Sequence, residues 1–374
     1  MRRLVHYLED LNAPSALATF SALDTYADLP DSAVLYVYTE ADIIQIAKSC
    51  GDLLFPGLDG IDAVSAWPEG FVFFTCVDSI KRPPEHPFSL LNLVYDPVNR
   101  KYYDPYGVYS DVRERCIRFL DEADQLPAWR FITDAAIALS RYGARPEEGL
   151  RLDRMVRTNG ATPYTDFQQR ILIDELMASK SPKEGFMLLR KTGFVDLHWP
   201  ELAALYGVRH SKEHHPEGNV WDHTIETFGY RKTKDLSLSL GLLFHDSGKP
   251  LARPKEGRMF DRHAQIGAGI AAKFMRKLGY EEGMIRDVAF LVREHMLPSF
   301  IHELPTFRTE RVMSSLLFPL LLELYRCDLS STYRGPDGYY RACKVYRSYL
   351  KNVRNPFRTS DGKKILNRYV DGRR

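Results

Sequence analysis

The hydrophobic pattern of this chain changes once, near Asp111, and that change limits the folds open to it. Before it, apolar and β-branched runs at 33–39, 71–77 and 90–95 have the length and composition of buried strands. A helix-like stretch, ADIIQIAKSC, lies between the first two runs. After Asp111, apolar residues recur at steps of three and four, which is typical of amphipathic helices. We therefore predict an α+β fold, in which a small mixed α/β head precedes all-α segments.

The length of the chain and the positions of its Gly and Pro residues indicate how these parts are divided. The 374 residues are two to three times the size of a typical domain. Gly143, Pro182 and Gly193 separate the helical segments, and the sequence contains no internal repeat. We expect a head over 1–115, a helical neck over 116–205, a further helical domain over 206–335 and a basic tail over 336–374.

Charge is distributed unevenly along the chain. The formal net charge is +2, but residues 341–374 hold 11 Lys and Arg against 2 Asp and Glu, so residues 1–340 carry an excess of 7 acidic side chains. Basic and aromatic side chains alternate in the tail, a pattern that suits phosphate contact and base stacking. The candidates for RNA contact are Arg347, Lys351, Arg354 and Arg358, with Tyr346, Tyr349, Phe357 and Tyr369 among them. A solvated terminal helix explains the same pattern equally well.

Cysteine usage and the first residues bear on the cellular compartment. Five widely spaced cysteines without a CxxC pair are typical of free thiols in a reducing cytosol. Charges interrupt the start MRRLVHYLEDL too early for a signal peptide, and no apolar run approaches the length of a membrane span. We expect a cytoplasmic protein without a membrane partner. The sequence does not predict the oligomeric state.

Histidines gather in one part of the chain. Nine of the eleven fall within residues 198–302, where an even distribution would place about three. His245 and Asp246 are adjacent at the end of an apolar run over 236–244, which is helix-like although its Leu/Ser alternation also fits a strand. Adjacent His and Asp side chains can share a cation where the backbone leaves its regular course, as at a helix end. Imidazole suits Mn, Fe, Ni, Co or Zn, and a carboxylate can bridge two ions, so we expect one or two divalent ions.

Asp328 is a second indication of a metal site. Leucines precede it at helical steps of four, three and four, which puts its carboxylate on an apolar face. A buried carboxylate needs a cation or a proton, and a metal shared with His223, His245 and Asp246 would supply the cation. The alternative, that Asp328 caps the turn at Ser330, is equally consistent with the pattern.

The order of these residues resembles that of a known family. His223, then His245-Asp246, then Asp328 is similar to the ligand order of the HD superfamily of metal-dependent phosphohydrolases. The phrases HHPEGNVWDHT (214–224) and HDSGKP (245–250) most resemble the HD domain that follows the polymerase head in bacterial tRNA nucleotidyltransferases (CCA-adding enzymes) and related poly(A) polymerases.

The resemblance assigns further residues. It implies that segment 206–335 is an HD domain, in which His263 and His295 would bind a second ion or orient a phosphate. Lys249 would form an ion pair with Asp246 or contact a substrate phosphate. For His263 and His295, a surface position near a helix end is an equally open alternative, and Lys249 could be plain surface charge.

The resemblance continues upstream, where the head departs from the family pattern. Residues 93–120 are similar to the family's strand pair around Asp-Pro-Phe-Gly-Gly. The chain contains no Gly-Gly, however, and residues 34–37, which line up with the family's Asp-x-Asp strand, hold no carboxylate. Nucleotidyl transfer needs such carboxylates to hold two Mg²⁺. The family's Arg-Arg-Asp segment and its neck motif Glu-Asp-x-x-Arg line up around 85–91 and 120–124, and both lose their arginines. We expect a head that keeps the fold without the reaction.

We predict from these residues an HD-type metal-dependent phosphohydrolase that acts on a nucleotide or an RNA-end phosphate. A metal-bound hydroxide would attack phosphorus, with Asp246 and Lys249 as catalytic residues and the head inactive. Two alternatives stay open: an RNA-binding or scaffold protein related to tRNA nucleotidyltransferases, and a divergent active tRNA nucleotidyltransferase. Binding of tRNA or another RNA through the basic tail would fit both alternatives.

Overall fold

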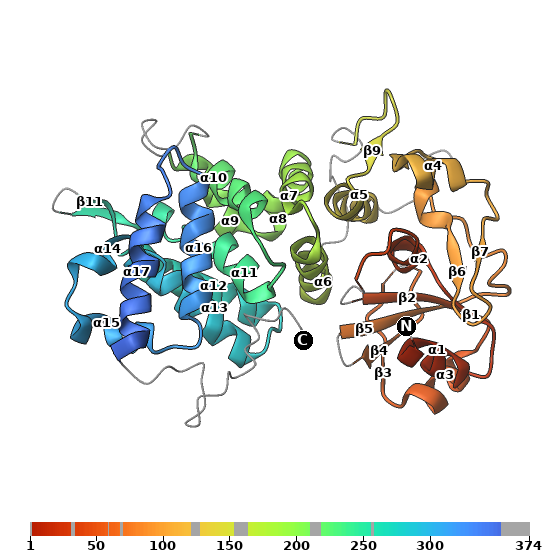
Figure 1. Cartoon of the computed structure of the whole chain (residues 1–374). Helices are drawn as coiled ribbons and strands as arrows, with labels where there is room; N and C mark the ends of the chain where they lie inside the picture. The colour runs from red at the N-terminus through yellow and green to blue at the C-terminus, as the bar shows by residue number, and fades with distance from the viewer. Residues whose placement is uncertain are drawn as a thin grey trace. The chain divides into compact units, whose positions relative to one another are not determined.

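The computed structural model describes residues 2–30, 34–58, 60–67, 70–120, 128–152, 164–209, 218–255 and 258–352. The chain forms two compact units (Figure 1). Unit 1 comprises Met1–Ala161 together with Asp174–Leu176, and unit 2 comprises Thr162–Ile173 together with Met177–Arg374. The expected division into head, neck, HD domain and tail is finer than this and stays a prediction.

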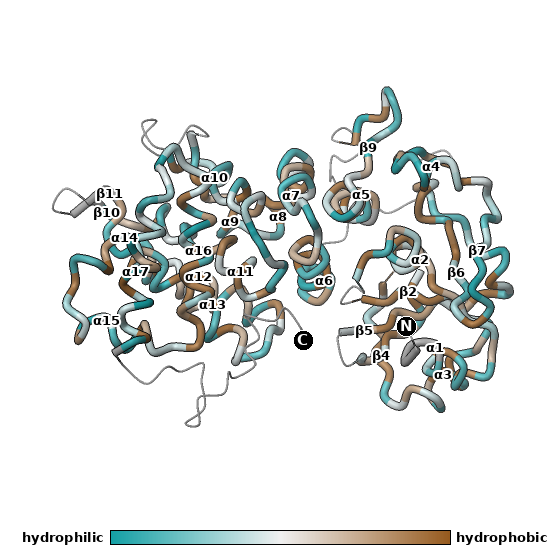
Figure 2. Tube along the Cα trace, in the orientation of Figure 1, coloured by the Kyte–Doolittle hydropathy of each residue, from teal (hydrophilic) through white to brown (hydrophobic). Residues whose placement is uncertain are grey.

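Unit 1 is built on a seven-stranded sheet with the strand order β3-β4-β5-β2-β1-β6-β7. The strands are β1 (Ser15–Leu17), β2 (Val34–Thr39), β3 (Leu53–Leu54), β4 (Ala63–Trp67), β5 (Gly70–Cys76), β6 (Val94–Asp96) and β7 (Lys101–Tyr103). The central pair β2 and β5 is parallel, with Val34 opposite Phe71, and the other neighbours are antiparallel. Parallel strands need cover on both faces, which accounts for the nearly continuous apolar character of β2 and β5 (Figure 2).

Helices and short elements complete unit 1. They are α1 (Arg2–Glu9), α2 (Thr19–Tyr26), α3 (Ile43–Cys50), the 3-10 turn η1 (Ser89–Asn92), α4 (Tyr109–Glu114), α5 (Ala128–Tyr142) and the parallel pair β8 (Cys116–Ile117) and β9 (Arg145–Pro146). Helix α3 begins with a capping box: the Asp42 side chain accepts a hydrogen bond from Gln45 N, and the Gln45 side chain accepts one from Asp42 N. The helix predicted between the first two strands is confirmed.

Two predicted elements of unit 1 differ in the structure. The run at 90–95, predicted as one strand, divides into η1 and β6, because buried Asn92 donates to the carbonyl oxygens of His86 at 2.6 Å and Phe88 at 3.0 Å and so holds a turn. The helix predicted from Asp111 ends at Glu114, since the next residue, Arg115, adopts the left-handed conformation at φ +55°.

Unit 2 consists, in its described residues, of helices and one hairpin. The elements are α6 (Asp166–Ala178), α7 (Pro182–Lys191), α8 (Phe194–His198), α9 (Pro200–Ala203), η3 (Ala204–Gly207), α10 (Val220–Glu226), η4 (Thr227–Tyr230), α11 (Leu236–Phe244), η5 (Lys249–Leu251), β10 (Arg253–Lys255), β11 (Arg258–Asp261), α12 (His263–Lys277), α13 (Glu282–Glu294), α14 (Leu297–Phe300), η6 (Ile301–Glu303), α15 (Thr306–Met313), α16 (Phe318–Ser330) and α17 (Asp337–Asn352). A sheet-containing unit and a helical unit together confirm the α+β class.

Helix α11 lies in the core of unit 2. Leu238, Leu240, Leu242 and Leu243 are all 0% exposed, so the helix is buried around its whole circumference. This burial explains why its sequence lacks amphipathic periodicity and also resembles a strand. The buried Ser239 is accommodated because its hydroxyl donates to the helix backbone at Asp235 O.

No described helix is both long and apolar enough to cross a membrane. The five cysteines, all within the described residues, are free thiols.

Candidate metal centre

Six predicted ligand side chains come together in unit 2. They are His223 on α10, His245 and Asp246 directly after α11, His263 at the start of α12, His295 directly after α13 and Asp328 on α16. Four of the six lie at a helix end, where the backbone leaves its regular course and side chains from distant segments can converge. The predicted juxtaposition of His223, His245, Asp246 and Asp328 is thus present in the structure.

The first group of donors contains His223, His245 and Asp328, whose ligand atoms all lie within 4.8 Å of one another. The Asp328 Oδ1 atom lies 2.9 Å from His223 Nε2 and 3.8 Å from His245 Nε2. Both imidazoles are 1% exposed, whereas the Asp328 side chain is 23% exposed because it faces a cavity. Asp328 therefore points to the imidazoles instead of capping the next turn.

The second group contains Asp246, His263 and His295, again within 4.8 Å. The Asp246 Oδ1 atom lies 3.7 Å from His263 Nε2 and 4.0 Å from His295 Nε2. The two Nε2 atoms are 3.3 Å apart. His295 is fully enclosed and His263 is largely so, which excludes the alternative that they are surface histidines.

Asp246 connects the two groups. Its Oδ1 atom faces the second group, while its Oδ2 atom lies 3.4 Å from His245 Nε2 and 4.0 Å from His223 Nε2. Lys249 donates from Nζ to the same Oδ2 atom at 2.6 Å. A carboxylate with one oxygen toward each group is placed to bridge two cations.

The backbone determines which ring nitrogens face the centre. His245, His263 and His295 each place Nδ1 against a carbonyl oxygen three residues earlier, at 2.7, 2.9 and 2.7 Å. A carbonyl only accepts hydrogen bonds, so Nδ1 carries the hydrogen and Nε2 of the neutral ring presents a lone pair. His245 Nε2 has no hydrogen-bond partner among the described residues. Lone pairs that face one another in a buried site need a cation between them.

The electrostatics of the centre favour neutral rings and ionised carboxylates. Burial lowers the pKa of His295 to about 3, with the His245 charge acting in the same direction. Burial would raise the pKa of Asp246, but the charge of Lys249, the largest opposing influence, brings it well below the usual range. Neutral imidazoles and charged carboxylates are the forms that bind metals, so the donor set suits a divalent transition ion such as Mn, Fe, Ni, Co or Zn.

A close backbone approach seats His263 beside Asp246. A Cβ atom at Gly248 would lie 2.0 Å from His263 O and 2.6 Å from Gly267 N. Only glycine permits this contact between the segment after α11 and the first turns of α12. The glycine in HDSGKP is therefore a packing requirement of the centre.

A cavity of about 240 Å³ opens onto both donor groups. Five of the six ligand residues and Lys249 line it, and its lining also includes Tyr325, Thr332 and Arg334, which sequence reasoning did not single out. Tyr325 lies on the same helix as Asp328 three residues before it, a spacing that could have indicated it. Arg334 follows α16 in a connecting segment, and no sequence pattern marks it.

The predicted RNA contacts divide between described and undescribed residues. Arg347 and Lys351 are exposed on α17, whereas Arg354 and Arg358 lie outside the described residues. The stacking role predicted for Tyr346 and Tyr349 is wrong, because both side chains are 7% exposed and Tyr346 packs against Phe318 with ring centroids 4.5 Å apart.

Unit 1 has its own cavity of about 110 Å³ beside β2, lined in part by Tyr36 and Thr19. Strand β2 contains no acidic residue. Nearby carboxylates have structural partners: Glu40 accepts from Ile80 N, and Asp62 accepts from Cys76 N. The described part of the head thus offers no pair of carboxylates on β2 for two metal ions.

The fold and the centre together define a protein with a mixed-sheet unit and a helical unit that contains a metal-binding donor set. No family model matches the chain. It is 36% identical over 265 residues to the CC-adding tRNA nucleotidyltransferase of Thermus thermophilus, covering 67% of this chain and 59% of that protein. It is 28% identical over 281 residues to the multifunctional CCA protein of Chromobacterium violaceum, covering 70% of this chain and 66% of that protein. The chain thus spans less than two thirds of the length of these relatives.

One solved structure supports the similarity at the level of the fold. The Bacillus stearothermophilus CCA-adding enzyme, crystallised in complex with CTP, superposes with a TM-score of 0.53 at 12% identity and covers 93% of this chain and 82% of that one. The predicted resemblance to bacterial tRNA nucleotidyltransferases is confirmed by sequence and by fold.

The predicted function is wrong. The proteins that this chain is similar to are tRNA nucleotidyltransferases, so the comparisons favour the stated alternative over an HD-type phosphohydrolase. The ligand order that led to the hydrolase prediction lies in the helical unit, whereas the similarity extends over 67% of the chain. The predicted divalent metal cofactor is confirmed, in that the structure provides two donor groups able to hold it.

Proposed function

We propose that this chain is a divergent relative of the tRNA nucleotidyltransferases that binds the acceptor end of a tRNA. The observation that carries the proposal is the 36% identity over 265 residues to a CC-adding tRNA nucleotidyltransferase. The shared fold with a CCA-adding enzyme supports it over nearly the whole of this chain. Binding is common to an active transferase and to a relative that has lost the reaction.

A basic face on α17 supplies the electrostatic part of this proposal. Arg341, Lys344, Arg347 and Lys351 are all exposed, and steps of three, three and four place them along one side of the helix. The acidic residue in this helix is Asp337, in its first turn. A row of cations on one helix face suits contact with successive phosphates of an RNA strand.

The metal centre is the second part of the proposal. His223, His245, Asp246 and Asp328 would hold one divalent ion, and His263 and His295 would share Asp246 with a second ion or hold a phosphate. The imidazole-rich donor set, the tautomers fixed by the backbone and the bridging position of Asp246 support this assignment. Lys249 balances the charge of Asp246. The catalytic roles expected of Asp246 and Lys249 belonged to the hydrolysis reaction, which the comparisons contradict.

Metal content tests the ligand assignment directly. Protein purified without chelator is expected to contain one or two equivalents of a transition metal by mass spectrometry, and His245→Ala is expected to lose most of it. His302→Ala is the matched control, since this histidine is 31% exposed and contacts Glu303 instead of the centre. Equal metal content in both variants would remove His245 from the ligand set.

Binding of tRNA is tested by fluorescence anisotropy at several salt concentrations. We expect the double variant Arg347→Gln, Lys351→Gln to bind tRNA about tenfold more weakly and with a shallower salt dependence, because two phosphate contacts are lost. Lys273→Gln, at an exposed position on α12, should bind as the unaltered protein does. Absence of tRNA binding by the unaltered protein would refute the proposal.

Nucleotidyl transfer is a second candidate, favoured by the named activity of the relatives. The lack of acidic residues on β2 counts against it, because transfer requires carboxylates that hold two metal ions. Incubation with labelled CTP or ATP and a tRNA that lacks its terminal nucleotides decides between binding alone and transfer. Incorporation of label would establish the transferase, and binding without incorporation would establish a non-transferring relative.

A further inference from the structure

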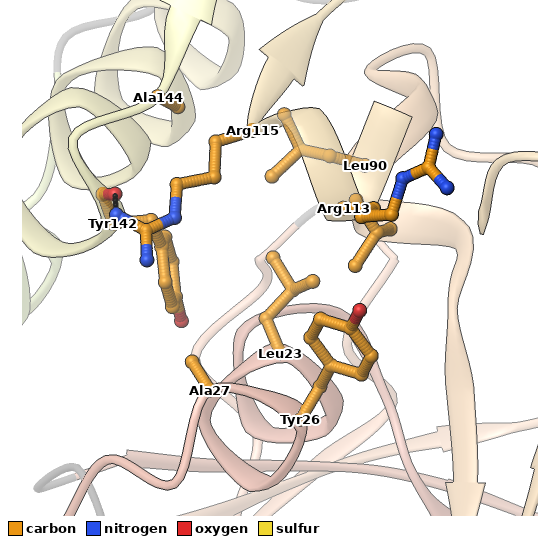
Figure 3. A pocket seen from close by; sticks show the side chains of 9 residues that line it. Leu23, Tyr26, Ala27, Leu90, Arg113, Arg115, Tyr142 and Ala144 are labelled. Carbon is orange, nitrogen blue, oxygen red and sulfur yellow. Dashed lines mark hydrogen bonds between the residues drawn. The ribbon is translucent and has the colours of Figure 1, made fainter. Parts of the chain in front are cut away.

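A larger cavity lies elsewhere in unit 1. Its volume is about 320 Å³, and its walls come from α2, η1, α4 and the end of α5 (Figure 3). None of its lining residues is shared with the cavity beside β2 or with the cavity at the metal centre. The volume falls in the range of pockets that accept small organic ligands.

A buried network holds two walls of this cavity, α2 and α5, against each other. Arg141 on α5 donates from Nε and from one terminal nitrogen to the two carboxylate oxygens of Asp24 on α2, both at 2.6 Å. The next residue, Tyr142, lines the cavity and places its hydroxyl 3.0 Å from Phe20 O on α2. The Arg141 and Asp24 side chains are only 3% and 5% exposed. A bidentate ion pair buried to this degree keeps the cavity in shape before any ligand enters.

One wall of this cavity is apolar. Leu23, Leu90 and Val112 line it and are buried, so the surrounding core fixes their side chains. Ala27 and Ala144 also line the cavity, and their side chains end at Cβ, which leaves the space beside the wall open (Figure 3). An apolar group placed there would leave water and pack against carbon atoms.

One guanidinium lies beside the apolar wall. Arg115 follows α4 directly and donates from one terminal nitrogen to Tyr142 O at 3.2 Å (Figure 3). A guanidinium has five N–H donors, so this bond uses a small part of its capacity. Arg113 also borders the cavity, but its side chain points away from Arg115 and lies 3.4 Å from Glu114 Oε1. Since the lining residues include no Asp or Glu, the cavity presents one positive charge to a ligand.

We propose that this cavity binds a small carboxylate with an apolar body. The carboxylate would contact the Arg115 guanidinium, and the body would pack against Leu23, Leu90 and Val112. A guanidinium holds a carboxylate through two parallel charge-assisted hydrogen bonds. The single charge of a carboxylate is balanced by one arginine, whereas a phosphate monoester would bring a charge of about −1.5 to −2. The proposal is independent of tRNA binding by α17 and of the metal centre.

Isothermal titration calorimetry of the full chain tests the proposal, with benzoate, hexanoate and their uncharged amides as probes. Each amide has nearly the shape of its acid but lacks the negative charge. Phenyl phosphate, a fifth probe, presents the ring of benzoate with a phosphate group. The protein is first treated with EDTA and dialysed, because a bound metal ion could itself bind a carboxylate.

Two variants alter different parts of the proposed site. Arg115→Gly removes the guanidinium and suits the left-handed backbone at φ +55°. Arg100→Gly is its matched control, because Arg100 is also exposed, also has a positive φ of +52° and does not line the cavity. Ala27→Phe fills the cavity from an exposed position and retains Arg115, and Ala66→Phe places the same ring at an exposed position outside the cavity.

We expect at least one of the two acids to bind, with a dissociation constant that rises about tenfold or more in Arg115→Gly and in Ala27→Phe. The two control variants should bind this acid as the unaltered protein does, and its amide should bind about tenfold or more weakly. Failure of both acids to bind, equal affinity for acid and amide, or equal affinity in Arg115→Gly and Arg100→Gly would overturn the proposal. Tighter binding of phenyl phosphate than of benzoate would overturn the carboxylate as ligand, whether or not the chain binds tRNA.

Discussion

The imidazole rings of the metal centre are oriented by carbonyls that lie close by in sequence. His245, His263 and His295 each donate from Nδ1 to the carbonyl oxygen of the residue three positions earlier. The same local geometry occurs at two helix ends and at one helix start, so each ring carries its own orienting contact. In metal proteins such outer contacts fix the tautomer and raise the basicity of the ligand. The short local sequence around each histidine therefore encodes most of its orientation.

His198, at the end of α8, gives a prediction at the scale of one residue. It is 5% exposed and packs on Phe194 with ring centroids 4.4 Å apart. Burial, followed by the charge of Lys277, lowers its pKa from 6.5 to about 4. The unfolded chain therefore binds the proton more tightly than the folded one, so this contribution to stability is present above pH 6.5 and is lost as the pH falls toward 4.

Between pH 7 and pH 5, protonation linked to His198 is expected to lower the free energy of unfolding by about 1–2 kcal/mol. Denaturant unfolding at the two pH values should show a smaller loss in His198→Phe than in the unaltered protein, because phenylalanine has no proton to bind. His302→Phe, which changes a partly exposed histidine, should show the same decrease in the free energy of unfolding as the unaltered protein. Identical pH dependence in the two variants would contradict the role given to His198.

At the scale of elements, the metal centre depends on how closely the segment after α11 approaches α12. Gly248 and Gly267 face one another there, and a Cβ atom on Gly267 would lie 3.2 Å from Gly248 N. This contact places the N-terminal residue of α12, His263, against Asp246. Two ligands on different helices are thus held in register by the absence of side chains between the helices.

Gly248→Ala is expected to disrupt the centre without removing any ligand. Its backbone conformation, φ −82° and ψ −12°, is open to alanine, so the effect would come from the overlap of the new Cβ atom with His263 O at 2.0 Å and Gly267 N at 2.6 Å. We expect a loss of stability of about 1–3 kcal/mol or more, together with reduced metal content. Unfolding midpoints and mass spectrometry of bound metal measure the two effects.

The matched control is Gly269→Ala, on helix α12. A Cβ atom at Gly269 would meet nothing within 4 Å. Alanine in a helix interior is favoured over glycine by about 0.5–1 kcal/mol, so this variant should be as stable as the unaltered protein or more so, with unchanged metal content. If both variants behaved alike, the close approach at Gly248 would not position the centre.

At the scale of the whole molecule, sequence patterns predicted a sheet-containing part, a helical part and the convergence of His223, His245, Asp246 and Asp328. His263 and His295 were associated with them by the family resemblance alone, with a surface position as an equal alternative. Strand β2 and helix α3 were identifiable because their signals are local, in an apolar run and in the capping box at Asp42. The split of residues 90–95 into a turn and a strand could not be identified from the sequence, since it depends on hydrogen bonds that buried Asn92 makes within its turn. The cavity residue Arg334 was missed for a related reason, because only the packing of unit 2 brings it beside the ligands.

Periodicity correctly placed Asp328 on the inward face of its helix, yet it could not show that this face opens onto a cavity. The function was misjudged on similar grounds. A ligand set identifies what a site can bind, whereas the comparisons concern the chain over most of its length. The strongest local signal in this sequence, the order of the metal-ligand residues, lies in unit 2 alone. It therefore did not indicate which proteins the whole chain is similar to.

Removal of metal should affect the two units differently. The proposed ligands lie on or next to α10, α11, α12, α13 and α16, all within unit 2, so a bound ion links five helices there and none in unit 1. A ligand at about a hundred times its dissociation constant stabilises the folded state by about 2.7 kcal/mol. For a unit of this size that corresponds to a melting temperature higher by roughly 5–10 °C.

Differential scanning calorimetry with and without EDTA measures this difference. We expect the chelator to lower the transition of unit 2 by that amount and to leave the transition of unit 1 in place, because the described head contributes no residue to the donor groups. Asp328→Ala, which lacks one ligand of the first group, should melt at a temperature that the chelator changes far less. A shift of both transitions together, or of neither in a protein shown to contain metal, would mean that the ion does not link these helices.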